Sequence, residues 1–173
     1  AITINFPTPQ PKAKYAKKRL VHVDHLMLYR PLFSAGATVT LRTDSKPLRD
    51  YALGQFATAG YDTLWVSDDV RRDHPEHPET EYECRTREMG AVVYGICATP
   101  GAQPSDDALA AARMQEQSLA CYLPDDLDEL TYVPLGMEEA VENFKNRARK
   151  GKKRLPQESQ GPLMVAASAN KRK

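Results

Sequence analysis

The chain has 173 residues, of which 41% are hydrophobic and 27% are charged, and its formal net charge is +1. This length fits one domain with extensions and is sufficient for a hydrophobic core. No apolar run approaches the ~20 residues of a membrane-spanning helix, and the widely spaced Cys84, Cys97 and Cys121 do not form a disulfide framework.

The small net charge conceals an acidic body between two basic ends. Residues 1–19 carry a charge of +5, residues 145–173 carry +9, and residues 20–144 carry −13. Basic ends of this kind favour acidic protein surfaces, RNA phosphates or anionic lipid headgroups. The candidate partner- or RNA-binding residues are therefore the bases of these ends. They are Lys12, Lys14, Lys17, Lys18, Arg19, Lys145, Arg147, Arg149, Lys150, Lys152, Lys153 and Arg154.

The first part of the chain is rich in proline. We expect residues 1–19 to form an extended basic arm, in which Ile2 and Ile4 alternate with Thr3 and allow a short edge strand. Residues 20–29 are apolar and fit either a strand or the start of a helix.

The clearest unit lies between residues 38 and 66. Alternating apolar and polar residues predict a strand over 38–42, and β-branched and aromatic residues predict another over 61–66. A helix is expected from Lys46, with Asp44 and Ser45 as candidate caps and Gly60 as the stop. A helix between two strands indicates a crossover within one sheet.

The second half begins with an acidic, proline-containing loop at 67–83. Residues 89–98 are the most apolar run and predict a buried central strand, in which Gly90 and Gly95 indicate a bulge or close backbone approach. A helix is expected from Asp106 to about Leu123. An amphipathic helix follows over 137–148.

This order predicts an α/β (α+β) fold. We expect a ferredoxin-like βαββα sandwich core, followed by a C-terminal amphipathic helix. The expected divisions are a basic arm at 1–19, one domain at 20–150 and a basic tail at 151–173.

The sequence contains no recognisable catalytic motif and no cofactor-binding fingerprint. His74, His77 and Cys84 have a spacing that matches no standard zinc pattern, so we interpret them as part of an exposed loop and expect no metal site. The adjacent acids, such as Asp68-Asp69 and Glu138-Glu139, are interpreted as helix caps and solubilising charge.

The leading hypothesis is a non-catalytic accessory subunit of a large assembly. The free thiols and the opposite charges of body and ends fit a subunit of a mitochondrial respiratory-chain or ATP-synthase complex. We therefore expect the protein on the matrix side of the mitochondrion, and the cytoplasm is the alternative location. The expected partners are other protein subunits. The first alternative is an organellar ribosomal protein that binds rRNA through its basic ends. The second is a small enzyme with a site near the 67–83 loop.

Overall fold

The computed structural model describes residues 1–114, 117–127 and 130–149. It contains a four-stranded sheet in the order β1-β2-β4-β3. The strands are β1 (Ile2–Asn5), β2 (Val39–Thr43), β3 (Tyr61–Ser67) and β4 (Tyr94–Pro100). β1 is parallel to β2, whereas β4 is antiparallel to both β2 and β3. The last strand is therefore inserted between two strands that run parallel to each other.

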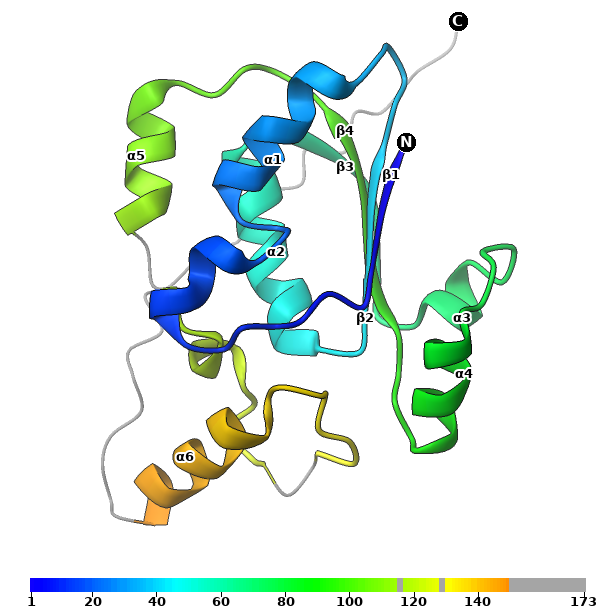
Figure 1. The fold of residues 1–173 in the computed structure, drawn as a ribbon, viewed down its shortest axis with the longest axis vertical. Coiled ribbons are helices and arrows are strands. Elements are labelled where there is room, and N and C mark those ends of the chain that lie inside the picture. Colours follow the sequence, from blue (N-terminus) through cyan, green and yellow to red (C-terminus); the bar gives the residue numbers. More distant parts are fainter. Residues whose placement is uncertain (115–116, 128–129, 150–173) are drawn as a thin grey trace, which may run out of the picture.

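Helices cover both faces of this sheet (Figure 1). One face carries α1 (Val23–Tyr29), α2 (Lys46–Thr58) and α5 (Asp106–Met114). The other carries α3 (Val70–Asp73) and α4 (Glu81–Glu88). The ferredoxin-like arrangement, with helices on one face only, is therefore wrong, although the mixed α/β class is confirmed.

Short helices complete the described chain. Two 3-10 helices, η1 (Ala13–Lys18) and η2 (Arg30–Leu32), flank α1. A third, η3 (Leu119–Tyr122), follows α5. The amphipathic helix expected near the C-terminus is α6 (Glu138–Arg149). Within the described residues, no helix is long and apolar enough to cross a membrane.

The unit predicted between residues 38 and 66 is present as β2, α2 and β3. The Ser45 hydroxyl accepts a hydrogen bond from the Leu48 amide at 3.3 Å and so caps α2. Gly60, with φ of 69°, ends this helix in the left-handed conformation that glycine adopts without strain. Local sequence signals were sufficient to predict α2, because a serine side chain fixes its start and a glycine backbone conformation fixes its end.

Other expectations are confirmed in part. The short edge strand allowed at the start of the chain is present as β1, and of the two alternatives for residues 20–29 the helix is right, since α1 begins at Val23. The arm at 1–19 is not extended throughout, because it contains η1. The expected 67–83 loop contains α3 and the start of α4. The central strand begins only at Tyr94, and α5 ends at Met114.

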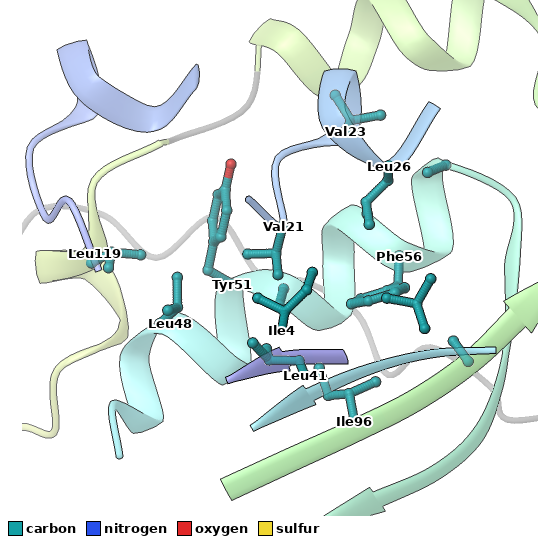
Figure 2. Close-up of a cluster of buried hydrophobic side chains, with 14 of the residues drawn as sticks. Ile4, Val21, Val23, Leu26, Leu41, Leu48, Tyr51, Phe56, Ile96 and Leu119 are labelled. Atoms are coloured by element: carbon teal, nitrogen blue, oxygen red, sulfur yellow. The ribbon is translucent and has the colours of Figure 1, made fainter. Parts of the chain in front are cut away.

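The main core lies between α2 and the sheet (Figure 2). Leu48, Tyr51 and Phe56 of α2 are almost fully buried against Leu41 of β2 and Ile96 of β4. Burying an aliphatic or aromatic side chain of this size contributes about 1.5–3 kcal/mol. This packing fixes the first turn of α2 against the end of β2, where the candidate site lies.

Candidate active site at the ends of the parallel strands

The parallel strands β1 and β2 end at the same edge of the sheet. Asn5 is paired with Arg42, and the Phe6 amide donates to the Arg42 carbonyl at 2.8 Å. Ligands of open α/β sheets bind outside the carboxyl ends of such strands. The segments that follow the two strands, residues 6–12 and 44–45, are therefore the first place to look for a site.

Residues 6–12 are held in an unusual conformation. Phe6 and Gln10 have positive φ angles of 46° and 53°, which costs residues other than glycine about 1–3 kcal/mol each. The buried Arg19 guanidinium holds this segment from inside. Its Nε donates to the carbonyls of Pro9 and Gln10, both at 3.1 Å, and its Nη2 donates to Gln10 at 2.7 Å.

Asp44 follows β2 directly and lies at the centre of the candidate site. Its carboxylate is 7% exposed and accepts hydrogen bonds from two tyrosine hydroxyls. The hydroxyl of Tyr132 lies 2.8 Å from Asp44 Oδ2, and that of Tyr82, on α4, lies 3.1 Å from the same oxygen. Burial, followed by the nearby Asp44, raises the pKa of both tyrosines, so both hydroxyls remain protonated donors at neutral pH.

A pocket of about 440 Å³ opens beside Asp44. This volume lies in the range of small-molecule sites, roughly 300–1,000 Å³. Carboxylates, aromatic rings and apolar side chains from four parts of the chain meet in its wall. They include Asp44, Asp50, Tyr94, Tyr122, Tyr132 and Met137. Lys46 also lines the pocket, and its amine lies 2.7 Å from Asp50. Asp44 and the tyrosine rings are therefore the part of the lining that suits a flat ligand with positive charge.

A buried charge cluster fixes α4, and with it Tyr82, next to β2. Glu83 is fully buried and forms an ion pair with Arg42 of β2. Arg71 Nε lies 2.7 Å from the other oxygen of Glu83, and Arg42 Nη1 donates to the Pro78 carbonyl at 2.7 Å. Because Tyr82 and Glu83 are adjacent, this cluster positions the Tyr82 hydroxyl at Asp44.

The lysines predicted to bind a partner lie beside the same loop. Lys14, Lys17 and Lys18 are exposed on η1, and the amines of Lys14 and Lys18 lie 4.9 and 4.8 Å from the centre of the Tyr15 ring. Lys12 Nζ lies 2.8 Å from Glu139. Arg19, in contrast, is 1% exposed, so its guanidinium supports the loop from within.

The basic residues of the other end are only partly described. Lys145 and Arg147 lie on α6, partly buried and exposed respectively, and Arg149 is its last residue. Lys150, Lys152, Lys153 and Arg154 lie outside the described residues. Of the basic residues that the structure describes, those of η1 lie next to loop 6–12 of the candidate site.

Cys84 does not join His74 and His77, with which it was considered from the sequence. It is exposed on α4, and desolvation together with Glu79 raises its pKa, the opposite of an activated thiol. The acidic pairs behave largely as expected, since Asp69 caps α3 and Glu138 and Glu139 lie in the first turn of α6.

The sequence did not single out the tyrosines of the site. Asp44 was recognised only as a helix-capping residue, and Tyr82 and Tyr132 lie 38 and 88 positions further along the chain. One sequence signal for the site was available. Asp44 follows a predicted strand, and ligand sites of α/β sheets often lie where such strands end.

Comparison with known proteins identifies relatives of this fold. The family described as "Putative methyltransferase" matches residues 1–96. A protein of Streptococcus equi subsp. zooepidemicus, named tRNA (guanine-N(7)-)-methyltransferase, is 32% identical over 97 residues, which cover 56% of this chain and 46% of that protein. Proteins of the same name from Alkaliphilus metalliredigens and Alkaliphilus oremlandii are 32% identical over 99 residues and 34% identical over 94 residues. These matches cover 57% and 54% of this chain, and 46% and 44% of the two relatives.

The matches therefore span less than half the length of these relatives. They nevertheless overturn the functional hypothesis drawn from the sequence. The family and the relatives are enzymes, so the interpretation as a non-catalytic accessory subunit of a mitochondrial complex is wrong, as is the expectation that the protein is not an enzyme. The rRNA-binding ribosomal alternative is wrong for the same reason. The accessory-subunit hypothesis rested on the lack of a short catalytic motif in the sequence. The candidate site, in contrast, is assembled from residues that lie far apart in the chain.

Proposed function

The chain belongs to the methyltransferase family that matches residues 1–96, and from this premise we propose that it takes part in methyl transfer to N7 of guanine in tRNA. The observation that carries the proposal is the buried Asp44 with its two tyrosine donors, beside a pocket at the carboxyl end of β2. The relatives' names supply the substrate and the position of methylation.

The chemistry of the proposed reaction suits the lining of this pocket. N7 of guanine carries a free lone pair, so no proton has to be removed before it attacks a methyl group. The methylated base is a cation. A carboxylate and the faces of tyrosine rings stabilise developing positive charge, and they do so most strongly away from bulk water.

The same charge argument applies to the methyl donor. A sulfonium donor such as S-adenosylmethionine supplies an electrophilic methyl group and is itself a cation. In this lining, the carboxylate of Asp44 and the rings of Tyr122 and Tyr132 can hold such a cation. Asp50, in contrast, is already paired with Lys46 at 2.7 Å. Asp44 and its two tyrosine donors would orient the ligand, because their mutual hydrogen bonds fix the carboxylate.

The exposed lysines of η1 support an RNA substrate. Lys14, Lys17 and Lys18 follow directly on the strained loop 6–12, and phosphate contacts of this kind position a nucleic acid without reading its sequence. The amines of Lys14 and Lys18 lie over the ring of Tyr15, which keeps these two positive charges close together.

The test is to incubate the protein with tRNA and methyl-labelled S-adenosylmethionine and to identify the labelled nucleoside by mass spectrometry. We expect 7-methylguanosine, and we expect Asp44→Asn to lower its rate of formation by about 100-fold, as loss of a preorganised electrostatic group does. The matched control is Asp62→Asn, an exposed acid on β3, which should leave the rate unchanged. Label in a different nucleoside, or an unchanged rate with Asp44→Asn, would refute the proposal.

A further inference from the structure

Three side chains with metal-ligating atoms converge on the loop after α3. The ligand atoms of His74, Glu76 and His77 all lie within 4.8 Å of one another. A Glu76 carboxylate oxygen lies 3.4 Å from His74 Nδ1 and 3.7 Å from His77 Nε2. Ligands about 2.0–2.1 Å from a tetrahedral ion are roughly 3.3 Å apart, so the two separations from Glu76 need only small adjustments. The remaining separation, of at most 4.8 Å, requires the two imidazoles to move toward each other.

The loop is held in this shape by contacts that do not involve the ligand atoms. The amide of His77 donates to the carbonyl of His74 at 3.1 Å, and Arg71 Nη1 donates to the carbonyl of His77 at 2.8 Å. The His74 ring stacks on Trp65 of β3 with 4.1 Å between centroids. Pro75 further restricts the backbone. The site is therefore largely preorganised.

The charge and exposure of the three groups also suit a cation. Glu76 supplies a carboxylate oxygen beside the ring nitrogens of the two imidazoles. The side chains of His74 and His77 are 22% and 30% exposed, and that of Glu76 is 68% exposed. An ion can enter from solvent and keep a water molecule as its fourth ligand.

We propose that His74, Glu76 and His77 form a binding site for one divalent transition-metal ion of the Zn²⁺ type. Two imidazoles and one carboxylate with an open fourth position are a ligand set that Zn²⁺ accepts. The bound ion would fix the α3–α4 connection to β3 through Trp65. The spacing considered from sequence paired the histidines with Cys84 and missed Glu76, which lies between them.

The experiment is calorimetric titration of ZnCl₂ into the untagged protein, with the melting temperature as a second readout. We expect one Zn²⁺ per chain and a higher melting temperature with the metal, since an ion that binds only the folded state stabilises it. His77→Gln and Glu76→Gln should each weaken binding at least tenfold.

Two matched variants test where the ion binds. Cys84→Ser removes the exposed thiol of α4, and Glu81→Gln removes an exposed carboxylate from the same helix. Both should retain wild-type affinity. Glu76 is exposed and makes no core contact, so Glu76→Gln keeps the test decisive even if the His77 variant folds poorly. Absence of Zn²⁺ binding by the wild type, or equal binding by the Glu76 variant, would overturn the proposal.

Discussion

Gly95 is a position of β4 at which the structure leaves no room for a side chain. A Cβ atom built on it would lie 2.6 Å from Val70 Cγ2 and 2.8 Å from the Trp65 ring. Both neighbours are packed side chains that anchor α3 and the His74 loop against the sheet. The sequence predicted a bulge or a close backbone approach at this glycine, but the groups that crowd it are the side chains of Val70 on α3 and Trp65 on β3.

We expect Gly95→Ala to lower the free energy of unfolding by about 1–3 kcal/mol, because overpacking forces neighbouring side chains or the backbone to shift. Urea denaturation measures the effect. The matched control is Gly101→Ala, whose Cβ would have the carboxylate of Asp62 as its nearest neighbour, an exposed side chain that can rotate away. Equal stability of the two variants would show that the packing at Gly95 yields more easily than the structure indicates.

At the scale of a helix, α1 depends on a buried histidine. His22 is 2% exposed, and its Nδ1 accepts a hydrogen bond from the Asp24 amide at 3.1 Å, which caps the helix. Burial is the main cause of its lowered pKa. Protonation would place a proton on the accepting nitrogen and remove the cap.

This lowered pKa predicts how stability depends on pH. The unfolded chain binds the proton with an ordinary pKa near 6.5, so the folded state is favoured above that pH and loses this contribution as the pH falls through the folded pKa. We expect the urea midpoint of the wild type to fall more between pH 7.5 and pH 5 than that of His22→Asn. Asparagine retains a capping acceptor without titrating, so the difference between the two curves isolates His22. Parallel curves would contradict the assignment.

The helices also show which elements sequence patterns can predict. α2 was predictable because its apolar residues share one face and its ends have a serine cap and a left-handed glycine. α4 was missed because it buries the charged Glu83 and the polar Thr86, so it lacks an apolar stripe. Glu83 can be buried because it pairs with Arg42 and Arg71, and no local sequence pattern predicts such pairing.

For the whole molecule, the topology of the sheet also depends on contacts that local sequence patterns do not predict. The strands of the central unit were predictable one by one, and the apolar run at 89–98 indicated the central strand that is present as β4. The neighbours and register of that strand were not predictable, because they depend on long-range pairing such as Thr40 with Cys97. The candidate site was hidden for a related reason. Asp44, Tyr82 and Tyr132 meet only after β2, α4 and the 130–137 segment have assembled.

The charge distribution leads to a prediction that belongs to the whole molecule. Residues 20–144 carry a charge of −13, so a nucleic acid would be repelled by most of the body and drawn to the η1 side. We expect Lys14→Ala, Lys17→Ala and Lys18→Ala together to weaken tRNA binding at low salt. The slope of log affinity against log salt concentration should fall by about two to three, because each phosphate contact contributes roughly 0.7–0.9. Fluorescence anisotropy over a series of KCl concentrations measures both the tRNA affinity and its salt dependence.

The matched control removes the same charge from the other face of the sheet. Arg72, Arg85 and Arg87 are exposed on α3 and α4, far from η1 in the fold (Figure 1), and their combined replacement by alanine should leave the salt slope unchanged. If both triple variants lower the slope equally, the RNA is attracted by net charge alone and the η1 surface has no special part. If only the lysine variant does so, the basic segment next to the Asp44 pocket directs the substrate to the site.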